Sequence, residues 1–291
     1  MEALQHLLQR SIPSMADLLR VSIWFSLLAI LFIPLERLFA LHPQKLFRKA
    51  VAVDIAYYFL NSLIPTVLVA TPMAVFAWGL RHILPASLHT WAAVLPMWLR
   101  LTLGLTVGEF GYYWGHRMSH EIPWLWRFHS IHHSAEEMDW LVSTRGHPFD
   151  VAFGRLCGLI PMYVLGLAQP MNGANVDPTA LIVSLLGTVW GFVVHANLRW
   201  RFEWLGLVIS TPAFHHWHHT NDEHINRNYA SMMPIWDKLF GTWFLPKQQW
   251  PPAYGIDTPM SPRLDVQLIQ PFLDDGEAAS LPAPPSPIAS S

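Results

Sequence analysis

Three closely spaced histidine patterns contain the residues of this sequence best suited to chemistry. They are His116-Arg-Met-Ser-His120, His129-Ser-Ile-His132-His133 and His215-His216-Trp-His218-His219. Positions i, i+3 and i+4 share one face of a helix, so each pattern can direct two or three ring nitrogens toward one point. Imidazole suits iron, copper, zinc and nickel alike. The spacing therefore predicts a metal site without choosing the metal.

The number of clustered imidazoles indicates more than one ion. Zinc takes four ligands and six-coordinate iron takes six, so eight or nine histidines predict two ions. His195 is added to the clusters because it lies at the end of an apolar run, level with the other patterns, whereas His216 falls on a different helical face and is expected to be structural. The candidate ligands are His116, His120, His129, His132, His133, His195, His215, His218 and His219.

Composition places these histidines in a membrane protein. The chain has 291 residues, of which 52% are hydrophobic and only 13% are charged, about half the charged share of a soluble domain. A formal net charge of -2 gives no general attraction to nucleic acid. The single cysteine, Cys157, excludes disulfides within the chain, cysteine-based zinc sites and iron–sulfur clusters.

Uncharged runs predict an all-α integral membrane protein with four to five transmembrane helices. The clearest run has 26 residues between Asp54 and Arg81, and about 20 suffice to cross a bilayer. The first run has no A-x-A cleavage site, so we expect a retained helix rather than a signal peptide. The other expected spans are Val21 to Leu35, Leu95 to Gly115, Leu156 to Val176 and Pro178 to Leu198, the last two joined by a short hairpin connection, PMNGANVDP.

Positive charges predict the orientation of these helices. The link after the first span contains Arg37, Lys45, Arg48 and Lys49, whereas the link after the second contains only Arg81. Cytoplasmic links carry the excess of lysine and arginine, so the first link is expected to be cytoplasmic. Following the chain, every histidine pattern then lies on the cytoplasmic face, as a histidine-rich helical cap.

A glycine stripe predicts close packing by the third span. Gly104, Gly108, Gly111 and Gly115 recur at spacings of four, three and four, and small residues at such spacing let another helix approach closely. At 100° per residue, Glu109, His116 and His120 project within about 40° of each other on a different face. One face is therefore expected to pack and another to present ligands.

The sequence from about Glu109 to Asp257 resembles the fatty acid hydroxylase superfamily, and within it the sterol desaturase branch. The resemblance rests on HRMSH, HSIHH, TRGHP, HANL, FHHWHH, NRNYASMMPIWDKLFGTW and YGID, in the family's order. It implies an integral membrane di-iron oxygenase, with the histidine boxes as ligands of two Fe ions and HANL placing His195 among them. Some relatives carry a further histidine where this chain has Arg199, so His147, His224, a carboxylate or water is left to complete the coordination.

The resemblance also implies a reaction. Dioxygen is the expected co-substrate, and a C–H position of a membrane lipid, such as a fatty acyl chain or a sterol, is hydroxylated or desaturated. The chain contains no GxGxxG fingerprint and no recognisable haem-binding domain, so a reductase, ferredoxin or cytochrome-like protein must donate the electrons. Glu109 and Asp150 are candidates for orienting ligand histidines by hydrogen bonding.

Two other function classes remain as alternatives. A metal transporter or metal-binding protein would use the same histidines, although transport favours ligands near the bilayer midplane rather than at one end of the spans. A zinc hydrolase is weakened by the absence of HExxH. The expected organisation is residues 1–94 as N-terminal transmembrane helices, 95–257 as the catalytic domain, and 258–291 as a C-terminal tail that is disordered from about residue 274.

Overall fold

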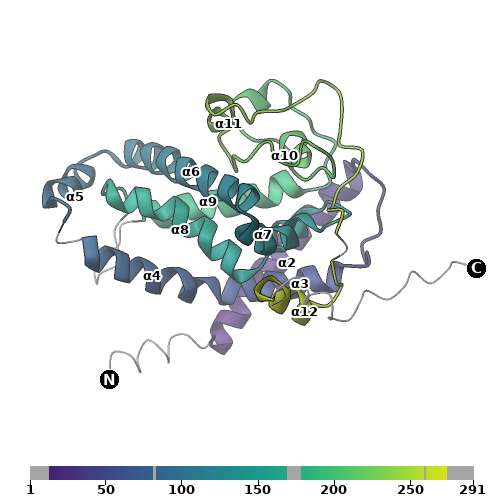
Figure 1. Cartoon of the computed structure of the whole chain (residues 1–291), viewed down its shortest axis with the longest axis horizontal. Helices are drawn as coiled ribbons and strands as arrows, with labels where there is room; N and C mark the ends of the chain where they lie inside the picture. The colour runs from purple at the N-terminus through teal and green to yellow at the C-terminus, as the bar shows by residue number, and fades with distance from the viewer. Residues whose placement is uncertain (1–12, 81–82, 169–177, 259, 274–291) are drawn as a thin grey trace, which may run out of the picture.

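The computed structural model describes residues 13–80, 83–168, 178–258 and 260–273, whose regular secondary structure is helical, with longer loops after residue 195 (Figure 1). No β-strand occurs among these residues; two isolated bridges join Ala40 to Leu198 and Thr220 to Tyr254. The all-helical prediction is therefore confirmed for this part of the chain. The α-helices are α2 (Met15–Leu38), α3 (Val51–Leu63), α4 (Pro65–Leu80), α5 (Ala86–Ala93), α6 (Met97–Glu121), α7 (Pro123–His133), α8 (Pro148–Val164), α9 (Thr179–His195), α10 (Pro212–His218), α11 (Ile235–Leu239) and α12 (Leu264–Ile269).

Among the described residues, two helical stretches are long and apolar enough to cross a membrane by length and composition, namely α2 and Val51–Leu80, which comprises α3 and α4. Helix α2 begins with a capping box, in which the Ser14 hydroxyl accepts from the amide of Asp17 and the Asp17 carboxylate accepts from the amide of Ser14. The run expected after Asp54 is divided into α3 and α4 at Pro65, because proline lacks the amide hydrogen that a continuous helix needs. Helix α9 is apolar but has only 17 residues.

The glycine stripe of α6 packs against α8 and α9, as predicted. A Cβ atom added at Gly111 would collide with the backbone carbonyl of Cys157 on α8, and one at Gly115 would lie 2.6 Å from the Cys157 Cβ. One at Gly104 would lie 3.1 Å from Thr179 Cγ2, on α9. Absence of a side chain is therefore what allows α8 to reach α6 so closely.

Helix α8 differs in its limits from the expected span of Leu156 to Val176. It begins eight residues earlier, at Pro148, where the His147 side chain accepts from the amide of Phe149, and it ends at Val164. The end is a Schellman motif: Gly166 adopts φ +73°, its amide donates to Tyr163 O, and the next amide donates to Met162 O. The sequence pattern of apolar residues continues past this glycine, which explains the wrong boundary. Most of the predicted hairpin connection lies outside the described residues.

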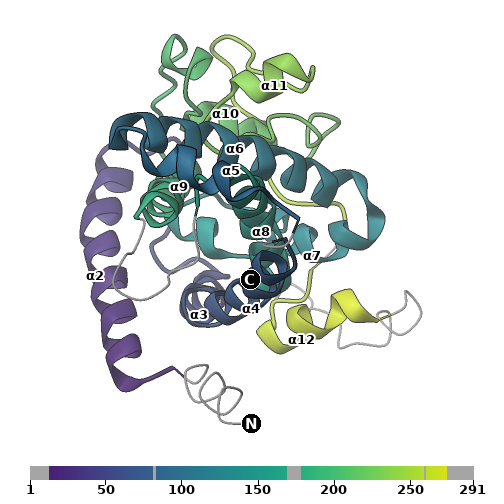
Figure 2. The same cartoon turned by 90° about the vertical axis from the view of Figure 1, so that its left-hand side faces the viewer.

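One end of each of the helices α6, α8 and α9 lies next to the histidines. His116 and His120 lie in the last two turns of α6, His195 is the last residue of α9, and α8 starts directly after His147. At the opposite end, Tyr163 of α8 donates to Ala77 O of α4, and Trp91 of α5 donates to Leu165 O. Figures 1 and 2 show α7 and α10 at the first end and α5 at the other.

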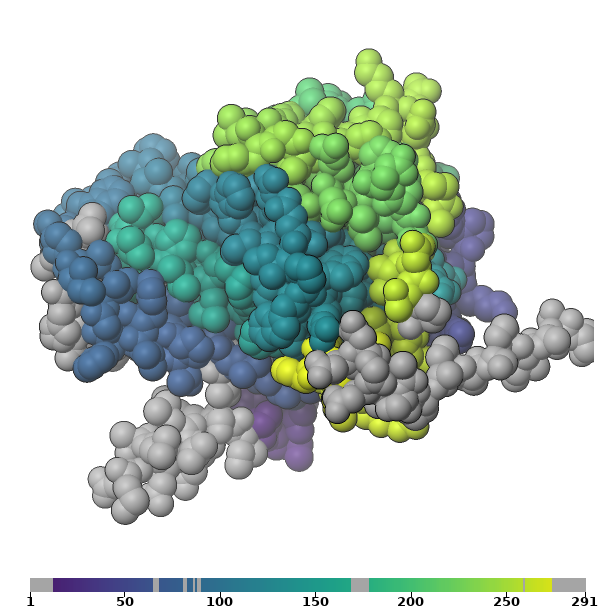
Figure 3. All heavy atoms as spheres, viewed as in Figure 1, coloured from purple at the N-terminus to yellow at the C-terminus, as the bar shows by residue number. Residues whose placement is uncertain are grey.

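Segments that follow α9 cover the histidine end of the helices. The part containing α10 and α11, green in Figure 3, forms a lobe over α6, and Figure 2 shows the same arrangement from a second direction. Near the C-terminus, the Arg127 guanidinium of α7 donates to Leu273 O, and Phe272 packs edge-on against Phe128 at 5.1 Å between ring centroids. Residues 260–273 are thus attached to α7, while the predicted disorder from residue 274 lies outside the described residues.

Candidate metal centre

Nine buried or largely buried histidines lie together in two adjacent groups, and they are the same nine that the sequence proposes. Within each group, one ligand atom per residue lies within 4.8 Å of every other, which is a spacing that could hold a metal ion. Group one is His116, His120, His129, His133 and His218, and group two is His132, His195, His215 and His219. The groups touch each other, since the rings of His133 and His219 stack at 4.4 Å between centroids.

Both HxxHH patterns are divided between the groups. The i and i+4 members of the first pattern, His129 and His133, belong to group one, whereas His132 belongs to group two. The second pattern is divided the opposite way, with His215 and His219 in group two and His218 in group one. The expectation that one pattern directs two or three nitrogens to a single point is therefore correct for its i, i+4 pair. The remaining histidine projects about 60° or more from that pair and reaches the neighbouring group.

Ring nitrogens of neighbouring histidines face one another at short distances in both groups. His116 Nε2 lies 3.1 Å from His129 Nε2, and in group two His195 Nε2 lies 3.2 Å from His132 Nε2 and 3.0 Å from His215 Nε2. Buried polar atoms normally have hydrogen-bond partners. Here, buried ring nitrogens without a partner occur in His120, His133, His215, His218 and His219. This donor set fits metal ions placed between the rings.

Group one is oriented from outside by both side chains and backbone. His129 Nδ1 lies 2.9 Å from Asp150 Oδ2, and His120 Nδ1 lies 3.3 Å from the Asn226 side-chain oxygen. The Nδ1 atoms of two more rings lie 2.7 Å from backbone oxygens, His116 from Tyr229 O and His218 from Arg227 O. An Nδ1–H bond of this kind selects the tautomer that leaves the Nε2 lone pair for a metal.

Group two is oriented by backbone carbonyls. His132 Nδ1 lies 2.7 Å from Arg145 O, and His195 Nδ1 lies 2.7 Å from Gly191 O, one turn earlier in α9. Each bond again directs Nε2 inward. The acceptor for His132 comes from the loop between α7 and α8, so the position of that loop determines the orientation of the ring.

Burial favours the neutral form of several of these imidazoles. It lowers the pKa of His132 to about 4, and the neighbouring His129 contributes to this shift. The pKa values of His133 and His218 lie well below their usual range for the same reason. A neutral imidazole has the lone pair that a metal requires, so the rings are ready to bind at physiological pH.

The sequence predicts that two acids, Asp150 and Glu109, orient ligand histidines. Asp150 contacts a candidate ligand, whereas Oε2 of Glu109 contacts backbone amides. Asp150 accepts from His129, as described, and also from the Ser119 hydroxyl at 3.3 Å. Glu109 Oε2 instead accepts from the amides of Met232 and Met233, at 2.6 and 3.2 Å. The helical-wheel argument places Glu109 near the ligand face of α6, but it lies two turns before His116 and meets the loop after α10.

That loop is fixed by a second acid. Asp237 accepts from the amides of Tyr229 and Ala230, at 2.8 and 2.9 Å, and from the Thr242 hydroxyl at 2.7 Å. Asp237 thus stabilises the segment after the last histidine pattern. Because Tyr229 O is the acceptor for His116, Asp237 helps to place the acceptor of one ring in group one.

Three other predicted histidines lie outside the groups. His216 points away, with Nδ1 2.9 Å from the Tyr254 hydroxyl and Nε2 3.1 Å from Ala196 O, as its helical face predicts. His147 caps α8, and its Nε2 lies 3.2 Å from Leu268 O. His224 pairs with Asp222 and stacks on Phe244. Neither His147 nor His224 belongs to group one or group two, so neither supplies a tenth imidazole to the centre.

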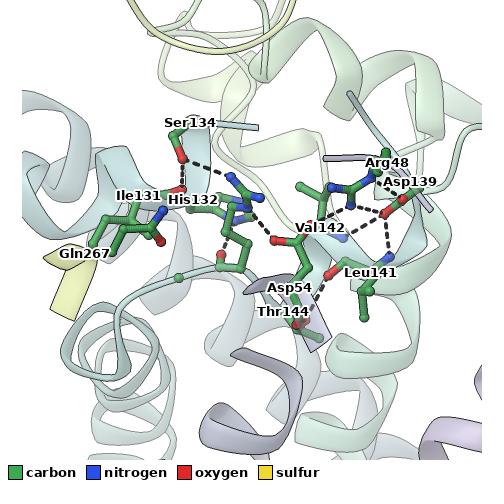
Figure 4. Close-up of polar contacts among 12 residues, drawn as sticks. Arg48, Asp54, Ile131, His132, Ser134, Asp139, Leu141, Val142, Thr144 and Gln267 are labelled. Carbon is green, nitrogen blue, oxygen red and sulfur yellow. Dashed lines mark hydrogen bonds and ion pairs between the residues drawn. The ribbon is translucent and has the colours of Figure 1, made fainter. Parts of the chain in front are cut away.

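Sequence reasoning missed the acceptors that orient the rings. Asn226 carried no signal of its own, and backbone carbonyls such as those of Arg145 and Tyr229 cannot be read from residue type. It also missed a buried set of charges, Arg48, Asp54, Asp139 and Arg145, that surrounds the loop behind His132 (Figure 4). The only signal was the presence of Arg48 and Asp54 beside a predicted membrane span.

The comparisons with known proteins agree with this geometry. A model of the fatty acid hydroxylase family matches residues 101–242, which include all nine histidines. The ornithine lipid hydroxylase of Rhizobium tropici is 36% identical over 190 residues, 65% of this chain and 55% of that protein. The alkylglycerol monooxygenase of Homo sapiens is 28% identical over 166 residues, 56% of this chain and 34% of that protein. No solved structure matches the chain.

A more distant match widens the range of activities among the relatives. The very-long-chain aldehyde decarbonylase of Oryza sativa is 28% identical over 162 residues, 51% of this chain and 25% of that protein. The chain thus spans about half the length of the bacterial relative and a smaller share of the eukaryotic ones. The family match encloses every histidine pattern and both groups that these patterns form, so residues 101–242 of the chain are those that match the fatty acid hydroxylase family.

Proposed function

We propose that this protein is an O2-dependent di-iron oxidoreductase that hydroxylates a C–H position of a membrane lipid. The observation that carries the proposal is the convergence of nine imidazoles in two touching groups, six of which have their outer Nδ1 bonded and so direct Nε2 into a group. Two ions match the number of groups. The family match favours iron over the other metals that imidazole accepts, and the name of the alkylglycerol monooxygenase favours dioxygen as co-substrate.

In this proposal, group one holds one iron ion with five imidazoles and group two holds the other with four. The bound ions supply the activation of dioxygen for attack on an unactivated C–H bond. The residues of the chain have other tasks. Asp150, Asn226 and the backbone carbonyls hold the Nδ1 protons of six rings, which keeps the Nε2 lone pairs of these rings directed inward. Burial excludes bulk water.

We further propose that the chain crosses the membrane four to five times, with the histidines on the cytoplasmic face. Helices α2, α3–α4, α6, α8 and α9 are the proposed spans. Large apolar side chains without protein cover support lipid contact, among them Ile30 of α2 at 71% exposure and Leu181 of α9 at 61%. The shared location of the histidine-side ends of α6, α8 and α9 supports a single face, and the excess of positive charge after α2 supports a cytoplasmic one.

A lipid substrate is supported by the names of the relatives, which describe hydroxylation of an ornithine lipid and monooxygenation of an alkylglycerol. Both names favour hydroxylation, and desaturation is the second possible outcome at the same centre. Electrons are proposed to come from a separate reductase, ferredoxin or cytochrome-like protein. The alternative of a metal transporter has no support from the family match or from the named relatives.

The test is anaerobic purification with metal analysis, followed by substrate-dependent oxygen uptake in the presence of reductant and membrane lipid extract. We expect about two iron ions per chain, oxygen uptake that depends on lipid, and a product that carries new oxygen. His132→Ala and His218→Ala should each lose metal, since each removes a ligand from a different group. A protein that binds no iron, or retains both ions in both variants, contradicts the proposal. A dehydrogenated product without new oxygen would replace hydroxylation by desaturation.

A further inference from the structure

One face of α3 contacts the loop that orients His132. Asp54 and Asn61 are seven residues apart, so both project from the same side of this helix. Both are buried, at 0% and 7% exposure. They contact residues 144–146, between the second histidine pattern and α8. Figure 4 labels Asp54 and Thr144 of this contact. Helix α3 lies outside residues 101–242, so the family match does not include this contact.

Asn61 holds the loop through two carbonyl groups. Its Nδ2 donates to Thr144 O at 2.9 Å and to Gly146 O at 2.8 Å. The carbonyl between them, Arg145 O, accepts from His132 Nδ1 at 2.7 Å. Arg145 has extended backbone angles, φ −65° and ψ 119°, and successive carbonyls of an extended chain point in opposite directions. Asn61 holds the carbonyls of Thr144 and Gly146 toward α3. The Arg145 carbonyl between them therefore points toward His132.

Charged side chains hold the same loop. Asp54 accepts from Arg145 Nε at 2.5 Å and pairs with Arg48 at 2.6 Å, while Arg48 also donates to both oxygens of Asp139, at 2.6 and 2.8 Å. The side chains of Arg48, Asp54 and Arg145 are at most 5% exposed. A buried network of two arginines and two acids is costly to desolvate and adds little net stability. We therefore attribute to this network the role of fixing the geometry of the loop, not of stabilising the fold.

We propose that Asn61 and Asp54, with Arg48, are positioning residues for the second metal ion. They fix the Arg145 carbonyl, which selects the Nδ1–H tautomer of His132 and directs its Nε2 into group two, where it lies 3.2 Å from His195 Nε2. The inference rests on the proposed function, because it requires that group two binds an ion. It connects the N-terminal helices, which the family match omits, to one half of the centre.

The test is a comparison of metal binding by the full chain in detergent, titrated anaerobically with Fe²⁺. His129→Ala and His132→Ala first assign the two binding constants to groups one and two. Asn61→Ala should then weaken the group-two ion by about 10- to 100-fold, the usual effect of removing an outer hydrogen-bond partner. The group-one ion should keep the affinity that it has in the wild type.

Double variants separate positioning from general support of the fold. When Asn61→Ala is combined with His132→Ala, Fe²⁺ affinity should fall no further than in His132→Ala alone, because both changes act through the same ring. When Asn61→Ala is combined with His129→Ala, the two losses of affinity should add. Gln267→Ala is the matched control, since it removes a buried amide that donates to Ser261 O instead. It should leave both constants unchanged. Asp54→Asn repeats the comparison through the charged contact, and Asn61→Ser replaces Asn61→Ala if the latter does not fold.

Several results would overturn the inference. They are wild-type affinity for both ions in Asn61→Ala and Asp54→Asn, equal weakening of both ions, or additive losses in the double variant with His132→Ala. These results differ from failure of the proposed function, which would appear as a wild-type protein that binds no iron or binds it at one group only.

Discussion

The two histidine groups lie side by side and both have rings held by backbone carbonyls, but among the described contacts only group one is also oriented by polar side chains outside the groups. Group one has five imidazoles, and side chains orient two of them, the Asp150 carboxylate at His129 and Asn226 at His120. Group two has four, and the contacts to His132 and His195 come from backbone carbonyls. A carboxylate makes the imidazole that it contacts a stronger donor than a neutral carbonyl does. The two proposed ions therefore occupy unequal environments.

This difference has a structural origin. Four of the five residues in group one come from the continuous α6–α7 region, with only His218 supplied from α10. Group two draws its four residues from α7, α9 and α10 and has its His132 acceptor in a loop that α3 holds. Group one is thus largely local in sequence, whereas group two depends on the assembly of distant segments.

Removal of one ligand from each group tests whether the groups bind separately. We expect His133→Ala to lose the group-one ion and His215→Ala to lose the group-two ion, with activity at background in both variants. Each leaves the other group with its own imidazoles and outer contacts intact. Metal analysis should give about one iron ion per chain in each case. Simultaneous loss of both ions in either variant would mean that the groups bind as one unit.

Removal of the carboxylate should affect only one group. Asp150→Asn replaces the charged acceptor of His129, and we expect about 10- to 100-fold weaker binding of the group-one ion. The group-two ion should be unchanged in the same anaerobic Fe²⁺ titration. Glu121→Gln is a suitable control, because this exposed acid pairs with Arg117 on α6 and contacts no candidate ligand in the described contacts. Equal weakening of both ions would show that the contrast between the groups is not functional.

Graded chelation should reveal a smaller difference between the intact groups. Because group two has one imidazole fewer and no carboxylate contact among the described ones, its ion should leave first as the chelator concentration rises. Unfolding temperature should fall in two steps, since an ion present at 100 times its Kd contributes about 2.7 kcal/mol to the free energy of unfolding. Iron analysis of each chelation stage provides the check. A single concerted step would contradict the order proposed.

The smallest effect on metal is expected at the histidine that belongs to neither group. His216→Ala leaves the Tyr254 hydroxyl and Ala196 O without this partner, which should lower the free energy of unfolding by about 1–3 kcal/mol. Both iron ions should remain bound with wild-type affinity. Chemical denaturation and iron titration of the same preparation separate the two quantities. Loss of either ion would make His216 part of the centre.

The sequence by itself determined the helical class, the nine candidate ligands and the packing face of α6. These follow from local rules: i, i+4 spacing brings two rings together, and a glycine stripe lets a helix approach. Local rules also failed in identifiable places. Apolar composition did not reveal that Gly166 ends α8, and the helical wheel did not reveal that Glu109 Oε2 meets the backbone of Met232 and Met233.

Only the tertiary structure decided which histidine joins which group and which atom orients each ring. Neighbouring residues such as His132 and His133 differ by about 100° around a helix, so they face different points, and the crossing of α6, α7, α9 and α10 determines what occupies those points. The acceptors are mostly backbone carbonyls, whose direction depends on loops and not on residue type. For His132 that direction is fixed from α3, more than 80 residues away in sequence from the loop that it holds.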